Sequence, residues 1–159
     1  MIRSYIFASV LLVAATNGAF AASAACNAID AANKKLALTP FHSVTEMGGR
    51  HSESVVTGGS RYIQIGKKWM KRPFDASDIT SASTPTATCA TAGSDQVDGE
   101  AASVFTVHNA TPDGTADMKY WISTSRGLPL KTETALTVPG GAKQQISVKY
   151  DYNNIRAPI

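Results

Sequence analysis

The residues of this chain that could do nucleophilic or metal chemistry form no recognised catalytic pattern. Its three histidines, His42, His51 and His108, lack the spacing of a helical metal site, and none neighbours a cysteine. Serines are plentiful, but there is no Gly-x-Ser-x-Gly motif of the kind that marks a nucleophilic serine. A hydrolase would need the histidines to converge in the fold on a serine or an acidic residue. We therefore expect no enzyme, no metal site and no cofactor.

The N-terminus has the layout of a secretory signal peptide. Residues 1–3 carry a positive charge, residues 5–15 are apolar, and small residues follow. Cleavage near Ala21 to Ala24 would leave a signal peptide of residues 1–21 and a single mature domain of residues 22–159. A retained anchor helix is less favoured, because the apolar run is short for a membrane span. We expect a periplasmic or secreted protein with no transmembrane segment in its mature chain.

The two cysteines, Cys26 and Cys89, predict a disulfide, because an even cysteine count in an exported chain usually means a bridge. Two free thiols would be the alternative, but no Cys-x-x-Cys motif supports a metal or redox role. Lipid attachment at Cys26 is a further alternative. It normally requires an aliphatic residue three positions earlier, where this chain has Ser23.

The charge balance does not favour a nucleic-acid partner. The formal net charge is +3, and loss of Arg3 with the signal peptide lowers it by one. Four basic residues surround Trp69 and could meet anionic headgroups; they are Lys67, Lys68, Lys71 and Arg72. Lysines that discourage pairing at the edge of a sheet are the favoured interpretation of this cluster.

The remaining elements predict an antiparallel sheet with one N-terminal helix. Residues 26–38 have amphipathic helical spacing and end before Thr39-Pro40. Turn residues such as Asp98-Gly99 and Pro112-Asp113-Gly114 separate strands with period-2 alternation. The clearest predicted strands are 41–46, 50–57, 61–65, 68–71, 101–107, 118–123, 130–138 and 146–152. Residues 74–92 are rich in Ser, Thr and Ala and lack alternation, so we expect an irregular excursion that Cys89 ties to the helix.

The predicted sheet has one apolar and one wet face, and the apolar face needs a cover. Only the helix and the excursion can supply that cover. The apolar face is predicted to carry Met118, Tyr120, Ile122, Leu130, Leu136, Ile146, Val148 and Tyr150. An ordinary core under the helix is one interpretation of these residues. If the face is larger than one helix can cover, it is a ligand-binding surface.

Several segments of the second half resemble bacterial periplasmic proteins with the fold of the lipoprotein carrier LolA. The resemblance covers residues 26–158. It rests on Val97-Asp98-Gly99, Ala102-Ser103-Val104-Phe105, Tyr120-Trp121-Ile122-Ser123, Gly127-Leu128-Pro129-Leu130-Lys131 and Tyr150-Asp151-Tyr152. It implies an α+β fold in which one curved antiparallel half-barrel has helices across its concave side. It also implies an apolar cavity that carries acyl chains or binds protein partners. We therefore expect a carrier for a lipid or acylated peptide, or alternatively a non-enzymatic envelope domain that binds a protein partner.

Overall fold

The computed structural model describes residues 17–79, 82, 84, 86–141 and 143–159. It contains one long helix, α1 (Asn17–Ala37), and a short 3-10 helix, η1 (Ala76–Asp78). The strands are β1 (Phe41–Met47), β2 (Arg50–Thr57), β3 (Ser60–Ile65), β4 (Lys68–Pro73), β5 (Ala87–Val97), β6 (Glu100–Thr111), β7 (Gly114–Ser123), β8 (Pro129–Thr137) and β9 (Gln144–Asp151).

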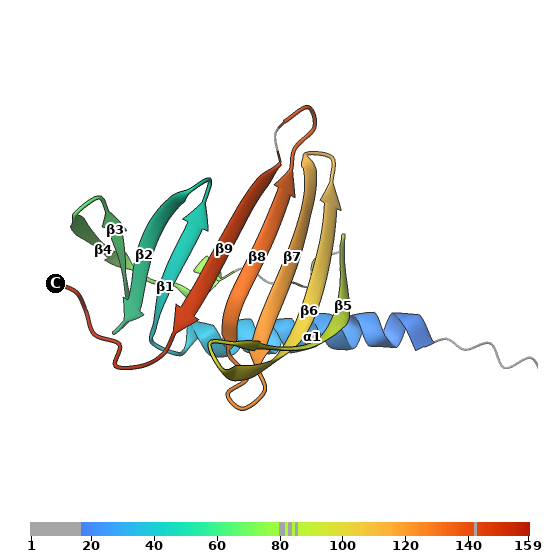
Figure 1. The fold of residues 1–159 in the computed structure, drawn as a ribbon, viewed down its shortest axis with the longest axis horizontal. Helices are drawn as coiled ribbons and strands as arrows, with labels where there is room; N and C mark the ends of the chain where they lie inside the picture. Colours follow the sequence, from blue (N-terminus) through green and yellow to red (C-terminus); the bar gives the residue numbers. More distant parts are fainter. Residues whose placement is uncertain (1–16, 80–81, 83, 85, 142) are drawn as a thin grey trace, which may run out of the picture.

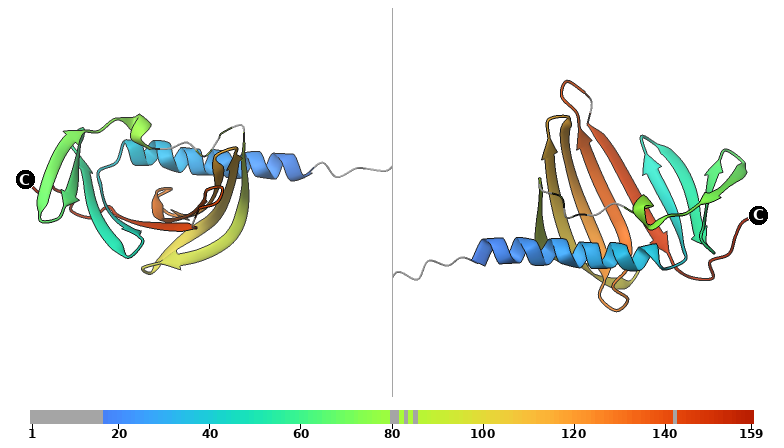
Figure 2. Two further views of the ribbon diagram at one scale, coloured as in Figure 1. Left: turned by 90° about the horizontal axis from the view of Figure 1, so that it is seen from above. Right: turned by 180° about the vertical axis from the view of Figure 1, so that it is seen from behind.

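The nine strands form one open antiparallel sheet in the order β4-β3-β2-β1-β9-β8-β7-β6-β5. Two meanders are joined where β9 returns to pair with β1, which places Tyr150 opposite Ser43. Figure 1 shows the strands side by side, and Figure 2 shows that the sheet curves into a trough with α1 across its concave side. The predicted half-barrel with an N-terminal helix is therefore confirmed.

The helix is longer than the predicted range of residues 26–38. Its described part extends back to Asn17, and residues 19–25 are mostly alanine, the strongest helix former. It ends at Ala37 as expected, just before Thr39-Pro40, and Thr39 Oγ1 donates to the carbonyl of Lys35 at 2.7 Å. Most of the predicted signal peptide, residues 1–16, lies outside the described residues. No helix in the described part of the chain combines the length and hydropathy needed to cross a bilayer.

The excursion after β4 is fastened to α1 as predicted. Cys26 and Cys89 form a disulfide with a Cα–Cα distance of 5.3 Å. The backbone N–H of Ala82 donates to the Asp30 carboxylate at 2.8 Å. Asp75 caps η1 by accepting from the N–H of Ser77 at 2.8 Å. Since the Cys26 sulfur is in the bridge, it is not free for lipid attachment.

The expectation that residues 74–92 are irregular is wrong from residue 87 onward, where β5 (Ala87–Val97) begins. This strand pairs with β6 along its length, with a register shift between Thr91 and Gly93. It lies at the edge of the sheet, and Cys89 is its only buried residue. An exposed edge strand has no apolar stripe, so its sequence shows no alternation.

The main core lies between α1 and the concave side of the sheet. Ala25, Ile29 and Ala32 of α1 pack with Val107 of β6 and with Ala82, Cys89, Tyr120 and Ile122. Leu36 extends this layer toward Phe41, Val56 and Leu128. A further cluster is formed by Ala102, Val104, Trp121 and Leu130, with Val97 and Tyr152 packed against it.

That further cluster corrects the prediction of one apolar and one wet face. Ala102 and Val104 pair with Ser123 and Trp121, so they lie on the face opposite Tyr120. The strongly curved β5 brings Val97 over them. The face that was predicted to be polar and solvent-exposed is therefore apolar where β6 and β7 meet the end of β5.

Candidate functional site

The strand register gathers most of the predicted apolar face on the concave side. Tyr120 of β7 pairs with Thr132 of β8, and Thr132 pairs with Val148 of β9. Thr134 likewise pairs with both Met118 and Ile146. Since side chains alternate across a strand, these residues project from one face of the sheet.

One predicted residue, Leu130, does not share this face. The β7–β8 register shifts between Trp121 and Ile122, which pair with Lys131 and Pro129 respectively, so Leu130 is the extra residue of a β-bulge. Its side chain packs with Trp121 on the opposite face. A bulge interrupts the two-residue period, which is why simple alternation placed Leu130 wrongly.

The helix covers only one end of this face. We call it the helix end, where β7 finishes at Ser123 and β8 begins at Pro129. Tyr120 and Ile122 lie there, each only 7 % exposed and packed against α1. Burial raises the pKa of the Tyr120 phenol to about 12, even though Asn33 forms a hydrogen bond with it. Both residues therefore belong to the core, and Tyr120 also lines the cavity described below.

The other end of the concave face is more open. At this far end β7 begins at Gly114 and β9 begins at Gln144, and α1 does not reach it (Figure 2). Partly exposed apolar side chains gather toward it, and together they form what we call the open patch. Its members are Met47, Leu136, Ile146 and Val148. The predicted residue Met118 lies on the same face but packs against the core cluster under α1. Met47, which the sequence analysis did not single out, joins through its pairing with Ile146 and is 42 % exposed.

A cavity of about 230 Å³ lies between the open patch and the helix end. Its walls come from α1, the η1 segment and the concave side of β1, β2, β3, β7, β8 and β9. The lining residues are Asn33, Leu36, Phe41, Ser43, Thr45, Ser54, Arg61, Asp78, Ile79, Tyr120, Thr132, Val148 and Tyr150. Hydroxyl and charged groups outnumber aliphatic ones, so this part of the trough is polar.

Tyr150 occupies the middle of the trough. Its ring lies edge-on to Phe41 with a centroid separation of 5.7 Å. Burial raises the pKa of its phenol, and Thr132 forms a hydrogen bond with it. The predicted residue Tyr150 therefore lies on the cavity wall between core and open patch.

Arg61 is the one basic residue among the described residues that line the cavity. Its Nε donates to Ser54 Oγ at 3.2 Å, and its guanidinium lies 5.8 Å from the centre of the Phe74 ring. Burial, followed by repulsion from Arg72, lowers the pKa of Arg61. Sequence reasoning missed this residue. A usable signal was present, because Ser43, Thr45 and Arg61 break the apolar alternation of β1 and β3 on the concave side.

The histidines do not converge. His42 and His51 each pair with a carboxylate on the neighbouring strand, Glu53 at 3.0 Å and Glu46 at 3.3 Å. His108 is on β6, where it pairs with Asp117 at 2.6 Å. Within the described ranges no three histidine, cysteine or acidic side chains are grouped so that they could hold a metal ion.

The basic residues around Trp69 lie on or beside β4, an edge strand of the sheet. Lys71 covers the ring of Tyr62 at 5.7 Å, and Arg72 approaches Asp78 at 3.8 Å. This position agrees with the interpretation of these lysines as edge protection.

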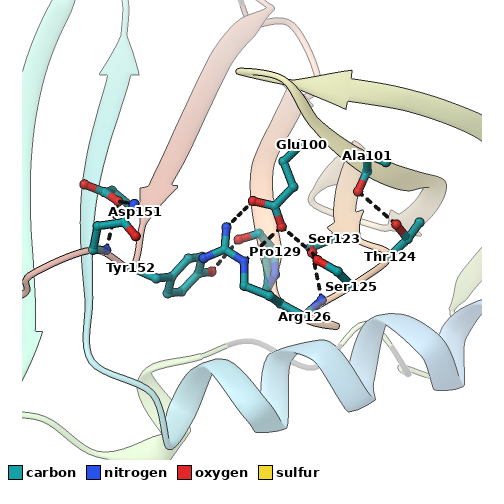
Figure 3. Close-up of polar contacts among 10 residues, drawn as sticks. Glu100, Ala101, Ser123, Thr124, Ser125, Arg126, Pro129, Asp151 and Tyr152 are labelled. Atoms are coloured by element: carbon teal, nitrogen blue, oxygen red, sulfur yellow. Dashed lines mark hydrogen bonds and ion pairs between the residues drawn. The ribbon is translucent and has the colours of Figure 1, made fainter.

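A polar cluster fastens the helix end of the sheet (Figure 3). Arg126 forms a two-pronged ion pair with Glu100, and Ser123 also donates to that carboxylate. The Arg126 guanidinium lies 5.0 Å from the centre of the Tyr152 ring, and the Tyr152 hydroxyl donates to the carbonyl of Pro129. The cluster thereby joins β6, the β7–β8 turn and the end of β9.

This cluster predicts a pH dependence of stability. The hydrogen bond from Arg126, followed by that from Ser123, holds the pKa of Glu100 below its ordinary value of 4.5. A carboxyl group with a lowered pKa stabilises the fold above its ordinary pKa, and this contribution is lost as the pH falls through the lowered value. We expect Glu100→Gln to cost about 1 kcal/mol at pH 7 and less at low pH.

Urea denaturation of wild type and Glu100→Gln, from pH 7 down to a pH below the lowered pKa of Glu100, measures this difference in the free energy of unfolding. Glu133→Gln is the matched control, because Glu133 pairs with Lys131 and is more exposed than Glu100. A Glu100→Gln loss that is the same at low and neutral pH would show that the charge of Glu100 does not contribute.

Comparison with known proteins identifies the fold. Neither a family model nor a curated protein sequence matches the chain. The structure is similar to that of lipoprotein LppX from Mycobacterium tuberculosis, with a TM-score of 0.51 at 10% identity over 84% of this chain and 98% of that one. LprF from Mycobacterium bovis also gives a TM-score of 0.51, at 10% identity over 86% of this chain and 95% of that one.

The complex of MucA and MucB from Pseudomonas aeruginosa contains a further similar chain. Its TM-score is 0.50 at 16% identity, over 85% of this chain and 59% of that one. The present chain thus spans less than two thirds of that neighbour's length. At such low identities the likeness shows a shared fold alone, and this fold is the LolA-like half-barrel that the sequence predicted.

Proposed function

We propose that this protein is a binding or carrier module for an apolar ligand, a lipid or an acylated peptide, that lies on the concave side of the sheet. The observation that supports the proposal is the open patch. One helix cannot cover a concave face made by this many strands, so the side chains of Leu136, Ile146 and Val148 stay partly exposed. Clustered apolar side chains that remain open to solvent typically mark a binding surface.

The proposed location is the periplasm or the outside of the cell. Cleavage after Ala21 would leave residues 22–37 of α1 in the mature chain, including the core residues Ala25, Ile29 and Ala32. The disulfide between Cys26 and Cys89 supports an oxidising compartment. LppX, a protein of the same fold, is itself described as a lipoprotein.

A protein partner is the second candidate, because MucB, which shares the fold, forms a complex with MucA. For this chain the same concave face would then receive a peptide segment rather than an acyl chain. A module of this kind would hold no extractable lipid, and cross-linking in the cell envelope would recover its partner.

Native mass spectrometry on protein purified from the periplasm, with an organic extract of the same sample, distinguishes the two candidates. We expect a bound acyl species in the spectrum and the same species in the extract. An apo mass together with failure to take up a fluorescent lipid would overturn the carrier proposal and favour the protein-binding one.

A further inference from the structure

We propose that Arg61 anchors the carboxylate of a fatty acid whose head enters the cavity and whose chain lies on the open patch. This inference rests on the proposed function and names its ligand class. Arg61 lies on β3, next to the η1 segment, and lines the cavity together with hydroxyl groups of Ser43, Ser54 and Thr132. These groups can donate hydrogen bonds to an anion beside the guanidinium.

The guanidinium has unused hydrogen-bonding capacity. Only its Nε has a hydrogen-bond partner among the described residues, the Ser54 hydroxyl, so both terminal nitrogens are left to bind something else. No carboxylate in the described part of the chain lies within ion-pair distance of Arg61. A partly buried charge is costly unless it is paired. The planar guanidinium of arginine can donate two parallel hydrogen bonds to one carboxylate, which is a bidentate ion pair.

The local charge favours an anion. Arg72 lies opposite Arg61 across the β3–β4 pair. The one acidic residue in the cavity wall, Asp78, is held at 3.8 Å from Arg72. Two guanidinium groups therefore face one carboxylate, and Asp78 cannot neutralise both.

The size of the cavity determines where the acyl chain of the fatty acid lies. A volume of about 230 Å³ is roughly that of seven or eight water molecules. It holds a carboxylate and the first few carbons and excludes the rest of a long chain. Val148 belongs both to the cavity wall and to the open patch, and Ile146 lies one pleat further along β9. The chain leaves the cavity along these two residues.

Isothermal titration calorimetry with three ligands of equal chain length tests the proposal: dodecanoate, dodecanol and dodecyl phosphate. We expect wild-type protein to bind dodecanoate about tenfold or more tightly than dodecanol, because the acid adds charge-assisted hydrogen bonds. Arg61→Met should remove this preference and leave the dodecanol affinity unchanged. Arg61→Lys, which keeps the charge but loses the fork, should retain part of it.

Arg156→Met is the matched control, because Arg156 is an exposed arginine in the segment after β9 and is part of neither the cavity wall nor the open patch. It should keep the preference for the acid. Equal affinity of wild type for acid and alcohol, or a preference that survives in Arg61→Met, would overturn the anchor while the carrier proposal stands. Tighter binding of dodecyl phosphate than of dodecanoate would overturn the carboxylate assignment and show that the cavity prefers a phosphate head group. Absence of binding to all three would overturn the anchor, and the native mass spectrum with the organic extract would then decide the carrier proposal separately.

Discussion

Removing the disulfide with Cys26→Ala and Cys89→Ala should lower the free energy of unfolding by about 4 kcal/mol. The bridge spans a sequence separation of 63 residues, and in the chain-entropy model a loop of this size restricts the unfolded chain by that amount. For a domain of this length the melting temperature should fall by roughly 10–20 °C. Thermal and urea denaturation of the double variant measure both quantities.

The same variant should also loosen one wall of the cavity. Cys89 connects the start of β5 to α1, and Asp30 holds Ala82 in the segment between η1 and β5. Reduced wild-type protein is the control, because it loses the same bridge without a change in sequence. Alkylation without reductant should modify neither cysteine. A loss of stability below 1 kcal/mol would mean that core packing alone fixes the helix on the sheet.

Local sequence signals placed the first four strands well because each is bounded by turn residues whose backbone angles few other residues adopt. Gly48-Gly49 and Gly58-Gly59 enclose β2, and all four have positive φ. Asp98 and Gly99 have φ values of 50° and 85°, the pattern of a type I′ hairpin turn, as the Asp-Gly pair predicted. Where a turn demands particular residues, the strand ends can be read directly.

Features that depend on tertiary context could not be predicted in this way. The bulge at Leu130 arises from the pairing between β7 and β8, and no residue type within β8 predicts it. The concave cavity depends on the return of β9 to β1, which brings Tyr150 beside Phe41. The polar character of Arg61 within β3 was visible in the sequence, but its enclosure depends on the curvature of the sheet and on η1.

Placing a charge on the open patch with Ile146→Asp should weaken binding of an acyl ligand at least about 100-fold. Ile146 is only partly buried, so it contributes apolar surface that a ligand would cover. Loss of that contact costs about 2 kcal/mol. Burial of an unpaired carboxylate under the ligand costs several kcal/mol more, and each 1.4 kcal/mol is a factor of ten in affinity. Titration with a fluorescent fatty acid measures the change.

The matched control is Gln145→Asp, which makes the same change in net charge one residue away on the opposite face of β9. It should bind the fluorescent fatty acid as wild type does, because Gln145 is exposed and a ligand in the trough does not touch it. Both variants should unfold near the wild-type temperature, since neither residue belongs to a buried cluster. Equal weakening by the two variants would point to general charge repulsion. Unchanged affinity in a folded Ile146→Asp protein would remove the ligand from the open patch, because no acyl chain can cover a carboxylate there without loss of affinity.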